Sequence, residues 1–538
     1  MAFPNRPGRG EAAVLALLVA AHATLLVHLA QRTGVTVDEP SHIVSSILYW
    51  EGNDRLLPRD LPPLIKIAGG WAAASAGFAI VEESHPVWKA NHEWEIGLDM
   101  IRRMSERGIR TAMFRARLPL LVFPLATLVL LWWWGRQIHS PPAGLAIAFL
   151  FLAEPTALGH GALFKNDHAA TFTFLLFWFT AWRFWKTPTY SSAAAMACGV
   201  ALAILAKLSL LIVVPLAILI VLVRSWNLRY LALVVFIPYL ASVAACQFQV
   251  RMAGLLPLPA LMWDGVQSLL SNSREENAVY LLGQRLPSGS PFYFAVAAAV
   301  KSPELILLLF AGGAGLLALR LKRRLLNAGD LFWILPGLLY FALASLSPLQ
   351  LGFRLILPAL PFTLLICGAA LQPAASRKWI LLSLLLPAAA PLAVYYPSYL
   401  SYFNLISGGP AKGLRYLSDS NVDWGQDLRE LRTWLYQHGS PRASISYMGA
   451  DNVFAYFLED EIDWIEPPFT PAGQRTRIFR PAPGIYAISA NLISGQFFEA
   501  PYRDYYRVFR EAEPIAYAGY SIYIYRFPRA DARAHPGH

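Results

Sequence analysis

Residues 13–42, AVLALLVAAHATLLVHLAQRTGVTVDEPSH, place two neighbouring carboxylates a few residues after a long apolar run. A membrane-spanning helix needs about 20 predominantly apolar residues, and Ala13–Ala30 comes close to that length without a charged side chain. The run has no small-residue cleavage site, so we interpret it as a signal anchor. Asp38 and Glu39 must then lie where the membrane meets water, at a depth where ionisable residues more often serve function than packing.

The composition is that of a polytopic membrane protein. Of the 538 residues, 56% are hydrophobic and only 15% are charged, whereas soluble domains carry about 25% charged residues. The formal net charge of +11 comes from short basic clusters between apolar runs, which is the pattern of cytoplasmic loops in membrane proteins. We therefore expect membrane lipids around the chain and no nucleic-acid partner.

About 11 apolar segments are candidate membrane spans. They are Ala13–Ala30, Leu118–Trp134, Gly144–Leu158, Ala169–Trp182, Ser192–Leu205, Leu208–Val223, Tyr230–Cys246, Phe292–Leu319, Leu331–Leu346, Leu355–Leu371 and Trp379–Val394. Several of the middle segments are short, and Ser192–Val223 can also be one bent hairpin. The count is therefore open by one or two spans.

Basic residues in alternate short loops decide the orientation. They all fall on one side of the membrane if the N-terminus is cytoplasmic. The loops concerned contain Arg6 and Arg9, Arg136, Arg183 and Lys186, Arg224 and Arg229, Arg320 to Arg324, and Arg377 and Lys378. An outward loop over 31–117 and everything after Val394 then lie outside the cytoplasm. We predict a transmembrane domain over 1–394 and an extracytoplasmic domain over 395–538.

The residues after Val394 differ in pattern from the apolar segments. Leu428, Leu431 and Leu435 share one face of a predicted helix within 427–436. Three segments rich in β-branched and aromatic residues, 444–448, 485–490 and 520–527, are predicted strands. The predicted fold class is therefore an α-helical polytopic membrane protein with a C-terminal extracytoplasmic α/β domain.

The outward loop contains a second periodic segment, Trp88–Phe114. Ile96, Met100 and Met104 recur there at helical spacing among charged residues, which predicts an amphipathic helix. The helix either lies in the membrane interface or packs on the protein itself, and the sequence leaves both interpretations open.

Ionisable residues near the outward ends of the spans form a candidate site. Asp167 opens the fourth span, Lys207 interrupts an apolar stretch, and Arg354 precedes the tenth span. The predicted topology brings these three residues to the level of Asp38. It also brings Lys66 there, while Lys301 lies deeper. A carboxylate can take a proton from a hydroxyl, and cations can stabilise a leaving phosphate where water is partly excluded.

Each candidate also has a structural interpretation. Asp38 and Asp167 can cap helices, because a carboxylate at a helix N-terminus is favourable. The cations, Lys207, Lys301 and Arg354, can be side chains that extend along the helix ends to reach water. His42 and His160 are candidate site residues that we interpret as local hydrogen-bond partners, so no metal site or other cofactor is predicted.

The ordered set of motifs resembles the C-type membrane glycosyltransferases, which have the GT-C fold. The motifs are the Asp38-Glu39 pair after the first span, Pro62-Pro63-Leu64 with Lys66 behind it, and an outward Asp167. The nearest groups are the protein O-mannosyltransferases and the bacterial lipid A aminoarabinose transferase. Tail motifs of uncharacterised bacterial members are similar to Tyr402-Phe403-Asn404, Gly408-Gly409-Pro410 and the segment from Asp419 to Leu428.

The resemblance implies an inverting transfer of a sugar from a polyprenyl-phosphate donor, without a nucleotide sugar. The acceptor is a lipid, glycan or protein outside the cytoplasm, and the protein lies in the bacterial inner membrane. By position, Asp38 is the base, Glu39 its neighbour and Asp167 the second acid of the site. Lys66 lies near the donor phosphate, and Leu61 replaces a His that is frequent in protein mannosyltransferases, which weakens the case for a protein acceptor.

Two other classes remain open from the sequence. A polytopic lipid or sugar transporter without transferase activity would also carry charged residues at membrane depth, often in inverted repeats. No internal symmetry is visible, and the ionisable residues gather at one face. A scaffold with an outer domain would leave Asp38 and Asp167 unexplained. For the tail, 395–538, we expect a role in acceptor choice, because the residues for chemistry lie upstream.

Overall fold

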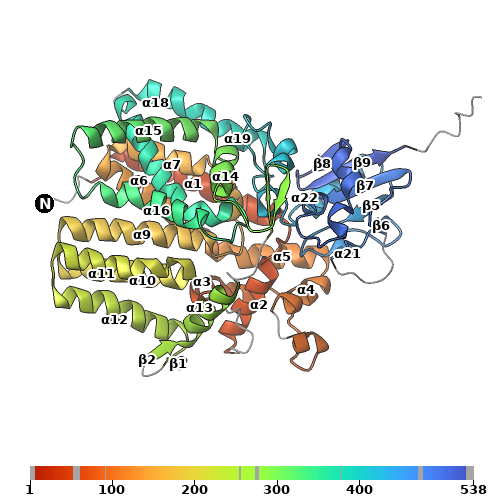
Figure 1. The fold of residues 1–538 in the computed structure, drawn as a ribbon, viewed down its shortest axis with the longest axis horizontal. Coiled ribbons are helices and arrows are strands. Elements are labelled where there is room, and N and C mark those ends of the chain that lie inside the picture. Colours follow the sequence, from red (N-terminus) through yellow and green to blue (C-terminus); the bar gives the residue numbers. More distant parts are fainter. Residues whose placement is uncertain are drawn as a thin grey trace, which may run out of the picture.

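The computed structural model of the protein describes residues 6–52, 61–90, 93–253, 256–272, 278–375, 377–469 and 477–528. Most of its helices lie side by side along the long axis of the molecule, and a small sheet domain stands at one end of this bundle (Figure 1). The first described residues lie at the opposite end. We call the end next to the sheet the domain end.

The bundle is built from apolar helices that follow the predicted segments. They are α1 (Arg9–Arg32), α6 (Val122–Ile138), α7 (Pro141–Leu152), α8 (Pro155–Gly161), α9 (Asp167–Lys186), α10 (Tyr190–Ala206), α11 (Val213–Arg224), α12 (Leu228–Ala245), α14 (Tyr293–Lys301), α15 (Glu304–Lys322), α16 (Leu331–Ser345), α17 (Leu360–Leu371), α18 (Lys378–Leu385) and α19 (Ala390–Val394). Short 3-10 turns connect several of them, among them η2 (Leu118–Leu121), η3 (Leu208–Ile212), η4 (Phe353–Ala359), η5 (Gln372–Ala374) and η6 (Leu386–Ala389).

Within the described residues, five helices are long and apolar enough to cross a membrane, and the bent pair α7–α8 makes a sixth candidate. Four shorter apolar helices add to them: Tyr190–Ala206, Leu208–Arg224, Leu331–Ser345 and Trp379–Val394. All the predicted spans thus contain helices, which confirms the predicted class of an α-helical polytopic membrane protein.

Two predicted spans are broken, and proline explains both breaks. Within Gly144–Leu158 the chain turns by 66° between α7 and α8, and α8 begins at Pro155 with the Glu154 side chain as its cap. Within Phe292–Leu319 helix α14 ends at Lys301 and α15 begins at Glu304. Ser302, which precedes Pro303, has an extended backbone, as residues before proline prefer.

The loop between α1 and α6 folds against the domain end of the bundle. It contains α2 (Glu39–Trp50), α3 (Pro63–Ala74), η1 (Pro86–Ala90), α4 (Glu93–Arg102) and α5 (Glu106–Arg117). The amphipathic segment Trp88–Phe114 is therefore not one helix, because Ser105 caps α5 and separates it from α4. Ile96 and Met100 are buried in the cluster that α2, α3 and α5 share, so α4 packs on the protein.

A second loop, between α12 and α14, carries two hairpins and a helix. Its elements are β1 (Val250–Ala253), β2 (Leu256–Pro259), α13 (Ala260–Asn272), β3 (Val279–Leu281) and β4 (Gln284–Leu286). Strands β1 and β2 pair antiparallel, as do β3 and β4. Helix α13 lies beside α2 and α3 (Figure 1), whereas β3 forms a bridge to Leu417.

The C-terminal sheet has five strands in the order β6-β5-β7-β9-β8. Its elements are α20 (Leu428–Gln437), β5 (Ala443–Ser446), α21 (Val453–Tyr456), β6 (Ile462–Trp464), β7 (Gly484–Ser489), α22 (Ala490–Ser494), η9 (Tyr502–Asp504), α23 (Arg507–Glu511), β8 (Ala516–Ala518) and β9 (Ile522–Phe527). Strands β6, β5 and β7 are parallel, while β9 is antiparallel to β7 and β8. The predicted helix and the three predicted strands correspond to α20, β5, β7 and β9, which confirms the predicted α/β domain.

Residues 395–427, which we call the connecting segment, were predicted to belong to the C-terminal domain. In the structure they pack with the helix bundle. Their side chains enter the cores of the bundle: Tyr399 and Tyr402 pack with Leu26 and Leu29 of α1. Phe403 joins the main apolar core. The segment includes η7 (Pro410–Arg415) and η8 (Asp419–Asn421). The sheet domain therefore begins at α20, and the connecting segment closes the domain end of the bundle. The predicted domain's last residues, 529–538, lie outside the described residues.

Candidate functional site

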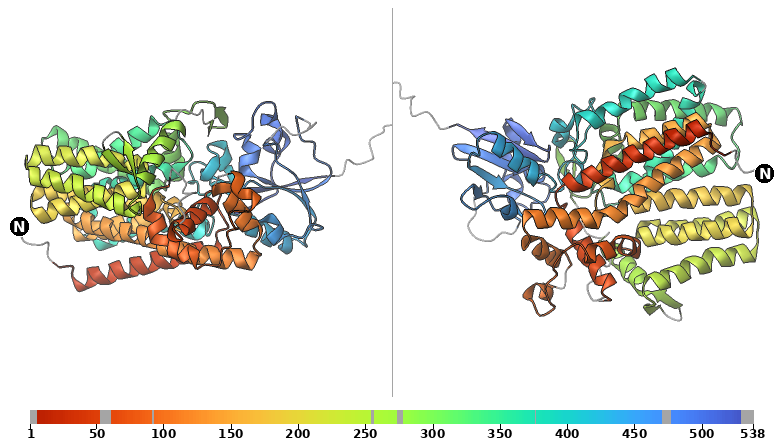
Figure 2. Two further views of the ribbon diagram at one scale, coloured as in Figure 1. Left: turned by 90° about the horizontal axis from the view of Figure 1, so that it is seen from below. Right: turned by 180° about the vertical axis from the view of Figure 1, so that it is seen from behind.

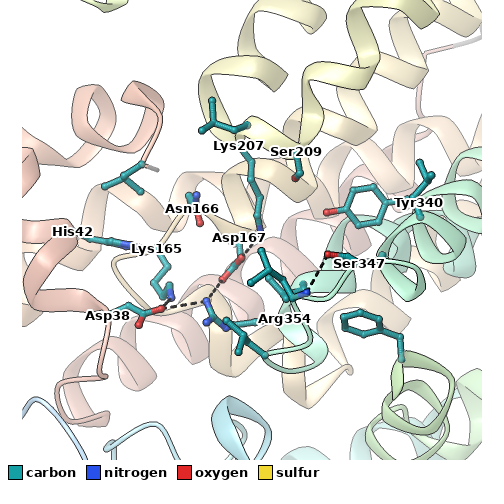
Figure 3. Close-up of a pocket in the computed structure, with 18 of the residues that line it drawn as sticks. Asp38, His42, Lys165, Asn166, Asp167, Lys207, Ser209, Tyr340, Ser347 and Arg354 are labelled. Carbon is teal, nitrogen blue, oxygen red and sulfur yellow. Dashed lines mark hydrogen bonds and ion pairs between the residues drawn. The ribbon is translucent and has the colours of Figure 1, made fainter. Parts of the chain in front are cut away.

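A cavity of about 600 Å³ opens at the domain end of the bundle. One part of its wall is charged, and the other part is formed by apolar side chains of η3, α16 and the turn before η4 (Figure 3). The charged residues that line it are Asp38, Glu93, Lys165, Asp167, Lys207 and Arg354. The apolar residues include Leu208, Ile212, Phe294, Leu343, Ala344, Leu349, Leu351 and Leu355.

Arg354 lies between the two carboxylates of the cavity (Figure 3). Its Nη1 atom is 3.3 Å from Asp38 Oδ2 and 4.0 Å from Asp167 Oδ2. Lys207 Nζ donates to Asp167 Oδ1 at 2.9 Å, and Lys165 Nζ forms an ion pair with Asp38 Oδ2. Three cations thus surround these two carboxylates, and Glu93 is the third acid of the cavity wall. The cluster of cations offers a place for an anionic ligand.

Helix ends and turns bring these side chains to the cavity. Asp38 precedes α2 and Asp167 is the first residue of α9, yet neither α2 nor α9 has a side-chain cap hydrogen bond. The carboxylates point to cations instead, so the capping interpretation of these two residues is not what the structure shows. Lys207 follows α10, where its extended backbone separates that helix from η3.

Arg354 depends on the glycine two positions before it. Gly352 has φ +118°, a conformation that L side chains rarely adopt. A Cβ atom at Gly352 would also collide with Ser420 Oγ of the connecting segment. The turn that presents Arg354 to the cavity therefore requires glycine at this position.

Burial and neighbouring charges shift the pKa values of Asp38 and Lys165. Burial raises the pKa of the Asp38 carboxyl, but Lys165 and Arg354 more than offset it and hold that pKa well below its usual range. Burial, together with Arg354, lowers the pKa of the Lys165 ammonium to about 8, although Asp38 and Asp167 act in the opposite direction. Asp38 is therefore ionised near neutral pH, and Lys165 loses its proton as the pH rises above about 8.

Glu39, predicted as the catalytic neighbour of Asp38, has a different place. Its carboxylate is fully buried against Arg117, with Oε2 2.6 Å from Nη2. It also accepts hydrogen bonds from the backbone N–H groups of Thr36 and Phe164, while Arg117 donates to carbonyls of residues 30–34. Glu39 does not line the cavity; it holds the loop that carries Asp38 against the loop that carries Lys165.

Two predicted phosphate ligands also lie outside the cavity wall. Lys66 on α3 and Lys301 at the end of α14 are completely buried. Lys301 Nζ donates to the carbonyls of Leu400 at 2.9 Å and Asn421 at 2.6 Å, so it ties the connecting segment to the bundle. A buried ammonium already hydrogen-bonded to carbonyls cannot reach a ligand in the cavity. Neither lysine lines this cavity.

Of the two candidate histidines, only His42 lines the cavity. His42 lines the cavity with its Nδ1 atom 3.3 Å from the Phe164 carbonyl oxygen. His160 is buried in α8, where its ring lies 5.5 Å from the ring of Trp424. Within the described residues, no three His, Cys, Asp or Glu side chains gather as metal ligands would.

The structure adds cavity residues that the sequence prediction missed. Lys165 is the most important, since it pairs with Asp38; its position two residues before Asp167 was the available signal. Tyr340 on α16 and Ser209 in η3 also line the cavity near Lys207 (Figure 3). Tyr340 lies within an apolar helix, where a polar side chain is itself a signal.

The fold and the site together define a polytopic membrane protein with a partly charged, partly apolar cavity at one end of its helix bundle. No protein-family model matches the chain, and the search of curated proteins found no match. Several solved structures are similar to it.

The lipid A aminoarabinose transferase ArnT from Cupriavidus metallidurans in the apo state is 13% identical, with a TM-score of 0.49 and coverage of 95% of this chain and 97% of that one. The same enzyme bound to undecaprenyl phosphate gives 14% identity and a TM-score of 0.48 over the same shares of the two chains. The oligosaccharyltransferase AglB from Archaeoglobus fulgidus, in complex with an inhibitory peptide and a dolichol-phosphate, is 13% identical, with a TM-score of 0.45 over 83% of this chain and 65% of that one.

Proposed function

We propose that the protein transfers a sugar from a polyprenyl-phosphate donor to an acceptor on the extracytoplasmic side of a bacterial inner membrane. The observation that carries the proposal is the cavity itself: three cations and an accessible carboxylate meet at the head of an apolar wall. That combination fits a ligand with a phosphate at one end and a hydrocarbon chain at the other.

The orientation of the helices supports a site on the extracytoplasmic face. Helix α9 starts at Asp167 in the cavity and ends with Arg183 and Lys186 at the opposite end of the bundle. Helix α15 likewise ends with Arg320 and Lys322. Because basic residues favour the cytoplasmic side, we place the N-terminus in the cytoplasm and the sheet domain outside.

The apolar wall gives the donor a route from the bilayer. Side chains of η3 and α16 line the cavity and also belong to apolar helices of the bundle, where Ile212 and Leu343 are exposed on its surface. A polyprenyl chain can lie against this wall while its phosphate stays beside Lys165, Lys207 and Arg354. The cations then stabilise the charge that develops on the phosphate as it leaves.

The different exposure of the two carboxylates supports different roles for them. The Asp38 side chain is 31% exposed, whereas that of Asp167 is 2% exposed. Asp38 therefore faces the acceptor and takes its hydroxyl proton, while Asp167 holds Lys207 and Arg354 in place.

The chemical step is a single displacement. The acceptor oxygen forms a bond to the anomeric carbon on the face opposite the phosphate, and the bond between that carbon and the phosphate oxygen breaks, which inverts the configuration. The proton passes to Asp38, and the polyprenyl phosphate leaves with the electron pair. Because the donor phosphate competes with Asp38 for Lys165 and Arg354, donor binding makes Asp38 more basic.

The proposal is tested by comparing glycolipids and envelope glycans from a strain that lacks the protein. We expect mass spectrometry to find a glycosylated species that is missing in the deletion strain. The wild-type protein and the Asp463→Asn variant, altered at an exposed residue of the sheet domain, should restore it, and Asp38→Asn should not. Full restoration by a well-expressed Asp38→Asn protein would refute the assignment. A deletion strain with unchanged glycans but altered lipid transport would favour a transporter.

A further inference from the structure

The connecting segment supplies a tryptophan to the cations of the cavity. The ring centroid of Trp424 lies 3.9 Å from Lys165 Nζ and 4.4 Å from Arg354 Cζ. Trp424 is 4% exposed, so Lys165 and Arg354 contact the face of a buried aromatic ring. The negative face of an aromatic ring attracts a cation at these distances, and most strongly when water is excluded.

The backbone around Trp424 is fixed to the loop that carries Asp38. Val37 N–H donates to the Trp424 carbonyl at 3.0 Å, and Gly34 N–H donates to the Gln426 carbonyl at 3.0 Å. The Gln426 side chain in turn accepts from Trp424 N–H at 2.7 Å. The ring is therefore held in register with Asp38.

The same segment is fixed to the turn that carries Arg354. Phe353 N–H donates to the Asn421 side-chain oxygen at 2.9 Å, and Ser420 Oγ donates to the Leu351 carbonyl. Lys301 holds the Asn421 carbonyl from the bundle side. The residues just before Arg354 and just before Asp38 are thus both held by positions 420–424.

We propose that Trp424 is a positioning residue for the transfer reaction, a role that rests on the function proposed above. Its ring holds the Lys165 ammonium and the Arg354 guanidinium against one plane, so that both charges are available to the donor phosphate. Without the ring, only the ion pairs with Asp38 and Asp167 would hold the two cations, and their common plane would be lost. The C-terminal part of the chain therefore completes the binding site for the anionic end of the donor.

Trp424 also packs against Leu163 and Leu400, and a purely packing role makes different predictions. Trp424→Phe keeps a smaller aromatic face, whereas Trp424→Leu keeps an apolar side chain without one. A packing role affects the stability of both variants and leaves the donor KM of the folded protein unchanged. A positioning role raises the donor KM in Trp424→Leu by about 10-fold, with a smaller change in Trp424→Phe and in kcat.

The decisive series replaces Trp424 with tryptophans that carry one, two and three fluorine atoms. Fluorine weakens the negative face of the ring and changes its size little. The probe is a polyprenyl monophosphate in lipid nanodiscs, and the readout is its Kd by native mass spectrometry. We expect the Kd to rise with each fluorine and to stay constant in Trp464→Leu, a control on β6 whose ring contacts Phe454.

The outcomes separate this inference from the proposed function. If the wild-type protein does not bind the polyprenyl monophosphate, the proposed function fails. If the wild type binds it, Arg354→Gln loses it, and the fluorinated series gives one constant Kd, the role of Trp424 is overturned while the proposed function stands. Because fluorine changes the size of the ring little, the fluorinated series tests the role of the ring even where Trp424→Leu does not fold.

Discussion

The charge state of Lys165 predicts how donor use depends on pH. Lys165 forms an ion pair with Asp38, and burial together with Arg354 lowers its pKa from 10.5 to about 8. The side chain is charged below this pKa and becomes neutral as the pH rises through it. If the charged form binds the donor phosphate, kcat/KM for the donor should be constant below the pKa and fall above it.

The size of the effect follows from the titration. With a pKa of about 8, about nine tenths of the Lys165 side chains are charged at about pH 7 and about one tenth at about pH 9. The value of kcat/KM, which reports the free enzyme, should therefore fall by about 10-fold over this range. The value of kcat should change less, because a bound phosphate favours the charged lysine.

The matched control is Lys165→Arg, since an arginine stays charged over the whole range. We expect this variant to lose the fall in kcat/KM while it keeps a measurable rate. Initial rates at limiting donor, measured in nanodiscs between pH 6 and about pH 9.5, test the prediction. A wild-type profile that stays flat to the upper limit, or an unchanged fall in Lys165→Arg, would refute the assigned role of Lys165.

Four further predictions follow from the geometry. Arg354→Gln should raise the Kd of a polyprenyl monophosphate by about 100-fold or more, because it removes the cation between two carboxylates; an unchanged Kd by native mass spectrometry would show that Arg354 is a structural residue. Lys301→Met should lower the unfolding free energy by about 1–3 kcal/mol, because two buried carbonyls lose their donor, and a raised donor KM in the folded variant would instead return Lys301 to the site. Glu39→Gln should lower the unfolding free energy by about 3–5 kcal/mol, since it leaves the Arg117 charge buried without its anion. Thermal unfolding close to that of the wild type would contradict the stabilising role of the Glu39–Arg117 ion pair. Cysteine at Ile406, which is 81% exposed, should react with an impermeant thiol reagent in intact cells and cysteine at Arg323 should not, and the reverse pattern would invert the proposed orientation.

The sequence was sufficient to predict the bundle and four of the charged residues in the cavity. Outward loops between apolar helices carry few ionisable residues, so Asp38, Asp167, Lys207 and Arg354 could be recognised by depth alone. The depth of a residue in the membrane does not, however, tell in which direction its side chain points. Lys66 and Lys301 lie near the domain end of the bundle and point into packed protein, which one sequence cannot reveal.

The connecting segment shows a second limit of the sequence. The composition changes after Val394, and this change predicts a domain boundary there. In the structure, Tyr399, Tyr402 and Phe403 are buried among helices of the bundle, and Trp424 lies beneath the cations of the cavity. These contacts join residues 70 or more positions apart, and local periodicity carries no information about such pairs.

The central claim is that Asp38 takes a proton from the acceptor while the neighbouring cations hold the donor phosphate. The direct test is the single-turnover rate of transfer by Asp38→Asn, with the donor and acceptor that the deletion strain identifies and with polyprenyl monophosphate binding measured on the same preparation. We predict binding within about threefold of the wild type and transfer slower by about 100-fold or more. Transfer at the wild-type rate by a folded Asp38→Asn protein that binds the lipid would contradict the account.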